Sequence, residues 1–280
     1  MVRMGDVWDR TTDFLGEHLS AVLPIVLLGI FVPLSVGNSL SELWLTAGSS
    51  AKVALTVGFV VIYLAVFWAY LALTAMAIDP ALARRAGPVG LGRLPAGVGA
   101  YLILALVILA LTIPLGVLLA ASGIDVDALG RGEPMGPVAP GIGWALLIYL
   151  LLLFAAVVAA TARLATMGAV VVAERRGAGA VVRAFRMTRG LTWKLIGVAI
   201  LYGVVSNICA MAAKTVFGTV LRLFAGGEGA LSVATVVTGI VVAAVSAAFT
   251  TLAAVFCAKL YVALAARAPA ELRLDDPARP

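Results

Sequence analysis

The chain has 280 residues, of which 63% are hydrophobic and 12% are charged, and its formal net charge at pH 7 is +6. Soluble domains are about 45–50% apolar and about 25% charged. A soluble globular fold is therefore excluded, because a core of this size cannot bury so large an apolar surplus. The apolar runs are continuous and do not alternate with polar residues, which favours membrane-spanning helices over a β-barrel.

The sequence predicts an all-α polytopic membrane protein with six transmembrane helices and two interfacial amphipathic helices. Residues 1–18 form an N-terminal cytoplasmic amphipathic segment, residues 19–266 the transmembrane domain, and residues 267–280 a charged, disordered cytoplasmic tail. The predicted spans are residues 19–40, 53–78, 98–121, 144–173, 195–216 and 233–261.

Three details of these spans carry further expectations. Pro24 and Pro33 predict a kink in the first span, since transmembrane helices tolerate proline. The segment after Asp79, rich in glycine and proline and carrying arginine, predicts a loop that lasts until the third span begins. The fourth span is longer than one straight crossing requires, so it either tilts strongly or emerges at its end.

The second amphipathic helix is expected between the fourth and fifth spans, within residues 177–192. On a helical wheel one arc is apolar and holds Val181, Ala184, Phe185 and Thr188. Arginines spaced three residues apart form the opposite arc. This composition is typical of a helix that lies in a membrane interface beside anionic lipid. The candidate lipid-headgroup contacts are Arg175, Arg176, Arg183, Arg186 and Arg189.

The distribution of basic residues predicts the topology. Sixteen Lys and Arg residues fall in the N-terminus, the second and fourth connections and the tail, against four in the remaining connections. Because positive loops stay in the cytoplasm, we expect a multi-pass protein of the cell (inner) membrane with both termini cytoplasmic. The positive charge at the ends of apolar runs indicates contact with anionic headgroups, and binding of nucleic acid is not expected.

Polar residues within the spans are the candidates for a functional site. Arg163 is a charge in or near the fourth span, and the alternative is that it snorkels to the headgroups. Asn38 and Asn207 either bond neighbouring helices or contact a substrate. Glu174 is expected to have a structural role, either pairing with Arg175, Arg176 or Arg163, or favouring the N-terminus of the basic helix.

No catalytic, metal or cofactor site is predicted. The chain has one histidine, His18, and two cysteines inside apolar runs, Cys209 and Cys257. These cysteines are expected to be small buried side chains, with a disulfide between helices as the alternative. Phosphate-binding loops, dinucleotide fingerprints, nucleophile elbows and zinc-binding helical motifs are absent from the sequence.

One stretch resembles a known family. Arg163, an apolar stretch, Glu174, a small-residue turn, the basic segment VVRAFRMTRG and Trp193 resemble the membrane domain associated with glycerophosphoryl diester phosphodiesterases. The leading segment VWDRTTDFLGEHLSAVLP is similar to the start of that family's first span. The family's activity belongs to a separate soluble barrel, so the resemblance implies a membrane module without the enzyme.

Two principal hypotheses follow. The first is a non-catalytic membrane-organising or accessory module that engages anionic lipid on its cytoplasmic face. The alternative is a transporter of a small or amphiphilic solute, which requires Arg163, Asn38 and Asn207 to converge on a shared cavity. A membrane-embedded lipid enzyme is a third possibility without a supporting motif. A protein partner or a homo-oligomer is left open by the sequence.

Overall fold

The computed structural model describes residues 3–124, 140–175, 177–225 and 232–267, and all regular elements in these ranges are helical. The helices are α1 (Met4–Glu17), α2 (Leu19–Val26), the π-helical η1 (Leu27–Phe31), α3 (Val32–Thr46), α4 (Ser49–Ile78), the 3-10 helix η2 (Pro80–Arg85), α5 (Ala86–Ser122), α7 (Pro140–Arg163), α8 (Met167–Ala173), α9 (Gly179–Met187), α10 (Thr192–Ala225) and α11 (Val233–Ala265). Arg176 and residues 268–280 of the expected tail lie outside the described residues.

The chain is an all-α polytopic membrane protein, as the apolar runs predict. Among the described residues, six helical stretches are long and apolar enough to cross a membrane: Leu19–Ser41, Ser49–Ile78, Pro80–Ser122, Gly141–Ala173, Thr192–Leu221 and Val233–Ala265. Many large apolar side chains on these helices are exposed, which suits helices that face lipid. The sequence-based fold class is confirmed.

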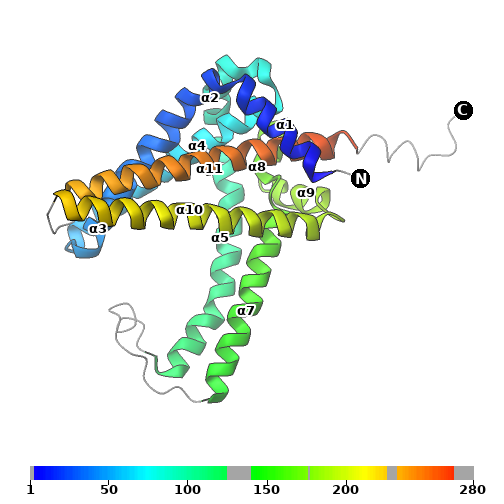
Figure 1. Ribbon diagram of the computed structural model, residues 1–280. Helices are drawn as coiled ribbons and strands as arrows, with labels where there is room; N and C mark the ends of the chain where they lie inside the picture. The colour runs from blue at the N-terminus through cyan, green and yellow to red at the C-terminus, as the bar shows by residue number, and fades with distance from the viewer. Residues whose placement is uncertain (1–2, 125–139, 176, 226–231, 268–280) are drawn as a thin grey trace, which may run out of the picture.

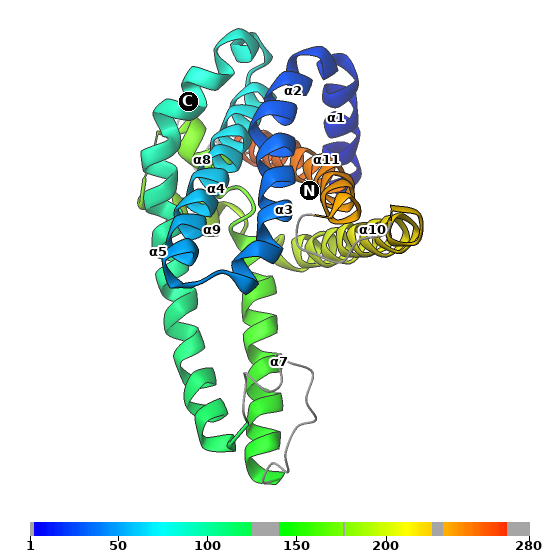
Figure 2. The same ribbon diagram turned by 90° about the vertical axis from the view of Figure 1, so that its left-hand side faces the viewer.

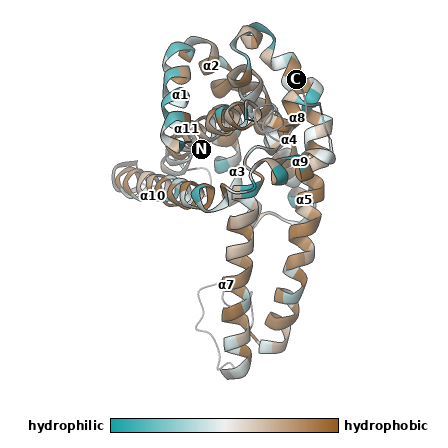
Figure 3. Cartoon of the chain, turned by 90° about the vertical axis from the view of Figure 1, so that its right-hand side faces the viewer, coloured by the Kyte–Doolittle hydropathy of each residue, from teal (hydrophilic) through white to brown (hydrophobic). Residues whose placement is uncertain are grey.

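The spans diverge from one end of the molecule. α5 and α7 form a hairpin that runs downward in Figures 1 and 2, whereas α10 and α11 run side by side across Figure 1 and point toward the viewer in Figure 2. α1, the link between α4 and α5, α9 and the C-terminal end of α11 lie toward the end from which the spans diverge. Hydrophilic residues gather on α1 and around α9, while the hairpin is largely apolar (Figure 3).

The first span contains the irregularity that its prolines predict. α2 passes into the π-helical turn η1 before α3 begins. Pro33 has no N–H to donate to the carbonyl four residues earlier, and inserted π-helical turns commonly accommodate such a gap. Gly29 lies in this turn, where an added Cβ would come 2.5 Å from the Cβ of Ala69. The irregular turn therefore brings the first span against α4.

The glycine- and proline-rich segment after Asp79 differs from the predicted loop. Pro80–Arg85 forms η2, and α5 begins at Ala86, so Arg93 lies inside a helix. The glycines of this segment allow close packing between helices instead of forming a loop. A Cβ added at Gly90 would lie 2.9 Å from the backbone nitrogen of Ala72, which means that α5 and α4 touch backbone to backbone at this point.

The fourth predicted span, residues 144–173, is not one straight helix. α7 ends at Arg163, residues 164–166 form a turn, and α8 follows. Met167 and Val170 of α8 are buried, and α8 packs against α4 and α5. The surplus apolar length is thus accounted for by a short buried helix that follows the crossing.

The N-terminal helix is fastened to the bundle through its apolar face. Val7, Thr11 and Phe14 are buried, and α1 packs against α11. From α11, the Nζ of Lys259 donates a 2.8 Å hydrogen bond to the carbonyl oxygen of Ala77 and lies 4.5 Å from the centre of the Phe14 ring. A lysine thus satisfies a carbonyl at the C-terminal end of α4 and holds α1 by a cation–π contact.

Replacing Gly90 by alanine is expected to destabilise the protein by about 1–3 kcal/mol, because the new methyl group would overpack against the backbone of α4. Gly92→Ala is the matched control on the same helix, where an added Cβ meets nothing within 4 Å and alanine favours the helix. The midpoint of thermal unfolding in detergent micelles is measured for both variants. Equal midpoints for the two variants would contradict the close approach of α5 to α4.

Candidate functional site

The candidate site lies where the end of α7, α8, α9 and the C-terminal part of α11 meet. The chain turns sharply on both sides of α9. Arg175 precedes it with a left-handed backbone (φ 56°), and Gly190 follows it with φ 87°. Such conformations reverse the chain over few residues and favour glycine. These turns set α9 against α8 as a short, separate helix between two membrane spans.

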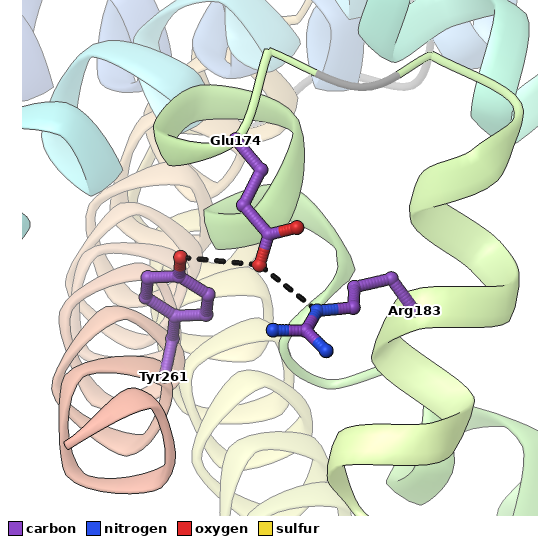
Figure 4. Close-up of polar contacts among 3 residues, drawn as sticks. All are labelled: Glu174, Arg183 and Tyr261. Atoms are coloured by element: carbon purple, nitrogen blue, oxygen red, sulfur yellow. Dashed lines mark hydrogen bonds and ion pairs between the residues drawn. The ribbon is translucent and has the colours of Figure 1, made fainter. Parts of the chain in front are cut away.

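Glu174 joins three elements by its carboxylate (Figure 4). Its Oε1 accepts a hydrogen bond of 3.0 Å from the Nε of Arg183 on α9 and one of 3.4 Å from the hydroxyl of Tyr261 on α11. The side chain of Glu174 is 19% exposed and that of Arg183 is 40% exposed. Charge-assisted bonds of this kind fix orientation, and here they hold α9 to the end of α8. Arg183 was not among the arginines expected to pair with Glu174.

The inner face of α9 packs against protein. Ala180, Ala184 and Thr188 are fully buried. The hydroxyl of Thr188 donates 2.9 Å to the carbonyl oxygen of Arg163, at the end of α7. The predicted apolar arc is therefore divided, because Ala184 and Thr188 face the bundle while Phe185 is half exposed. Protein contacts thus cover Ala184 and Thr188 and leave Phe185 accessible.

The outer face of α9 carries both apolar and cationic groups. Val182 is 55% exposed and Phe185 50% exposed, and both Arg186 and Arg189 are exposed beside them. Trp193, at the start of α10, is 85% exposed. We call these five residues the α9 outer face. Apolar and guanidinium groups side by side suit the boundary between acyl chains and headgroups.

Arg183, Arg186 and Arg189 do not act alike. Arg183 and Arg186 lie on α9, whereas Arg189 lies in the turn that follows it. Arg183 turns toward Glu174, while Arg186 and Arg189 remain exposed. Arg175, also predicted to contact lipid, is exposed in the turn before α9.

Arg163 lies at the C-terminal end of α7. Its guanidinium carbon lies 4.3 Å from the centre of the Phe185 ring, so it stacks on α9. A cation at this position also interacts favourably with the negative end of the helix dipole. Arg163 is therefore a residue of the α7–α9 junction, which fits the alternative that places it near the end of its span.

The convergence required by the transport hypothesis is not made by the described residues. The amide of Asn38 on α3 donates 3.2 Å to the carbonyl oxygen of Gly239 on α11, as interhelical bonding predicts. The amide of Asn207 is exposed and donates 2.8 Å to Gly203 of its own helix. Arg163 contacts α9 instead, so the three side chains have partners in three different places.

Sequence reasoning missed the role of Tyr261 and of Lys259. Both lie in the last turns of a long apolar span, and each bonds a residue far away in the sequence. Their positions in the sequence place them near the end of the span, but the residues that they bond depend on which helices pack together. Cys209 and Cys257 are free thiols in the structure, and neither belongs to the site.

In the described ranges no three side chains of His, Cys, Asp or Glu gather as metal ligands would. No protein-family model, curated protein or solved structure matches the chain. The resemblance of residues 163–193 to the glycerophosphodiesterase-associated membrane domain therefore stays a prediction.

A double-mutant cycle of Glu174→Gln and Arg183→Gln is expected to give a coupling free energy of about 0.5–1 kcal/mol, since solvent screens this partly exposed pair. Unfolding free energies in micelles provide the measurement. The control cycle pairs Glu174→Gln with Arg175→Gln, an exposed neighbour, and should give a smaller coupling. If both cycles gave the same value, the Arg183 contact would have no specific role in holding α9.

Proposed function

We propose that this integral membrane protein is a non-catalytic accessory module that engages anionic lipid through the α9 outer face. The observation that carries the proposal is the division of α9 into two faces. One face is buried against α5 and α8, while the other exposes Phe185 and Val182 beside Arg186 and Arg189. A helix already fixed to the bundle loses little entropy when its outer face meets lipid.

The energy available from such a surface is sufficient for docking. Each arginine near an anionic leaflet contributes about 1 kcal/mol, so Arg186 and Arg189 together supply about 2 kcal/mol. Phe185 and Trp193 add burial of aromatic surface at the headgroup level. Arg183 contributes less, because its charge is compensated by Glu174.

The same end of the molecule carries further exposed cations, among them Arg84 and Arg85 of η2. Under the topology that their distribution predicts, this end faces the cytoplasm of the cell that holds the protein in its inner membrane. The anionic leaflet would then meet α9, α1 and the α4–α5 link together. The proposed role is to organise lipid, or a partner protein, at this face.

The transport alternative has less support. Its three polar residues have separate partners, and the cavity that Asn38 lines includes neither Arg163 nor Asn207. This cavity lies at the ends of α3, α10 and α11.

The proposal is tested by hydrogen exchange of α9 in nanodiscs of phosphatidylglycerol and of phosphatidylcholine. We expect about thirtyfold stronger protection in the anionic discs for the wild type, which corresponds to about 2 kcal/mol. Arg186→Gln with Arg189→Gln should remove most of this difference. High salt should reduce it in the wild type, since exposed charges are screened.

Arg84→Gln with Arg85→Gln is the matched control, because it removes two exposed charges from the same end of the molecule without touching α9. This variant should keep the lipid dependence of α9 protection. The proposal fails if protection of α9 is the same in both lipids. It also fails if the two double variants lose the lipid dependence of this protection to the same extent.

A further inference from the structure

A polar cavity lies at the opposite ends of the spans from α9. It has a volume of about 350 Å³ and is formed by α3, α10 and α11. These helices meet at the left-hand side of Figure 1, far from the α9 region. Its polar lining includes Asn38, Lys214, Thr215, Thr219, Thr235 and Thr238. So many hydroxyl groups around one cavity are unusual between helices whose other surfaces are apolar.

Thr238 is the residue that points to a ligand. It is 8% exposed, lines the cavity, and its Oγ1 has no hydrogen-bond partner among the described residues. Two other buried threonines of the spans, Thr74 and Thr251, each donate 2.7 Å to a carbonyl oxygen of their own helix, whereas Thr166 shares the lack of a partner but does not line the cavity. A buried hydroxyl without a partner is destabilising, so a ligand acceptor at this point would gain a hydrogen bond that the protein does not use.

The electrostatics of the cavity favour an anion. Lys214 supplies an ammonium group, and no carboxylate of the described residues lies within ion-pairing distance of it. The first turn of α11 also lines the cavity through Ala234 and Thr235. The N-terminus of this long helix carries partial positive charge and adds to the charge of Lys214.

The donors around the cavity match a phosphate group. Ammonium and hydroxyl groups from α10 and α11 surround it, and such donors form charge-assisted hydrogen bonds to phosphate oxygens. The exposed apolar residues Val216, Phe217 and Val220 lie on the other side of α10 and do not line the cavity.

We propose that this cavity binds a phosphate group, of the kind carried by phospholipid headgroups and by soluble phosphate esters. Lys214 pairs with the phosphate charge, and Thr238 donates its hydroxyl hydrogen to a phosphate oxygen. Asn38 positions α3 against α11 by its bond to Gly239 and so closes one wall of the cavity.

The test is a binding titration by native mass spectrometry with the full chain in maltoside micelles. The probes are phosphatidylglycerol, diacylglycerol with the same acyl chains, and soluble glycerol phosphate. All variants are made in the Arg186→Gln/Arg189→Gln background, so that lipid held at the α9 outer face does not contribute. We expect phosphatidylglycerol to bind and diacylglycerol to bind at least about tenfold more weakly, because it lacks the charged group.

Two variants test the assigned residues. Lys214→Gln should weaken binding of phosphatidylglycerol about tenfold and Thr238→Val about fivefold. Thr238→Val should also raise the thermal midpoint of the lipid-free protein, because valine removes the unpartnered hydroxyl. Thr166→Val is the matched control: Thr166 has an equally buried Oγ1 without a partner among the described residues, but it lies before α8. It should raise the midpoint and leave lipid binding unchanged.

Binding of glycerol phosphate with the same dependence on Lys214 and Thr238 would support the phosphate site and assign a soluble ester as its ligand, whereas binding of the lipid alone assigns the headgroup. The proposal is overturned if diacylglycerol binds as tightly as phosphatidylglycerol, or if Lys214→Gln and Thr238→Val bind the probes as the Thr166→Val control does. Because Arg186 and Arg189 are replaced throughout, these outcomes are independent of the function proposed for α9.

Discussion

The close approach of neighbouring helices to the second half of α4 is the contact on which the rest of the structure depends. Apolar side chains gain little by leaving lipid for protein, so helices in a membrane associate through tight van der Waals packing. Gly29 and Gly90 bring two chain segments against α4 at Ala69 and Ala72. The neighbouring part of α4, with Leu71 and Met76, is fully buried. α8 packs on this core, and its end places Glu174 between α9 and α11.

Two surfaces of different character result at the two ends of the spans. The α9 outer face presents guanidinium groups on an exposed helix, where charge and salt govern the interaction. The cavity around Lys214 and Thr238 is partly enclosed, and hydrogen-bond geometry matters there as much as charge. One surface is suited to many headgroups at once and the other to a single molecule.

The sequence was sufficient for the six spans, because length and continuous apolarity determine them. It could not locate the break at residues 164–166, because an apolar run continues after Arg163 and α8 is held by packing on α4 and α5. The helical wheel separated the apolar and the cationic residues of α9, but which face is buried depends on how α9 packs against the other helices. The glycines after Asp79 predicted a loop because a sequence alone does not distinguish turn glycines from those at a close helix contact.

The divergence of the α5–α7 hairpin from the α10–α11 pair has a consequence for the surrounding bilayer (Figure 1). Helices that point in such different directions cannot all stand along the membrane normal. α11 has 33 residues and is thus about 50 Å long, against a hydrocarbon layer of about 30 Å. This excess length lets a strongly tilted helix still reach across. Bilayer thickness therefore acts on the angle between the two groups: a thicker membrane would press them together and a thinner one would let them spread.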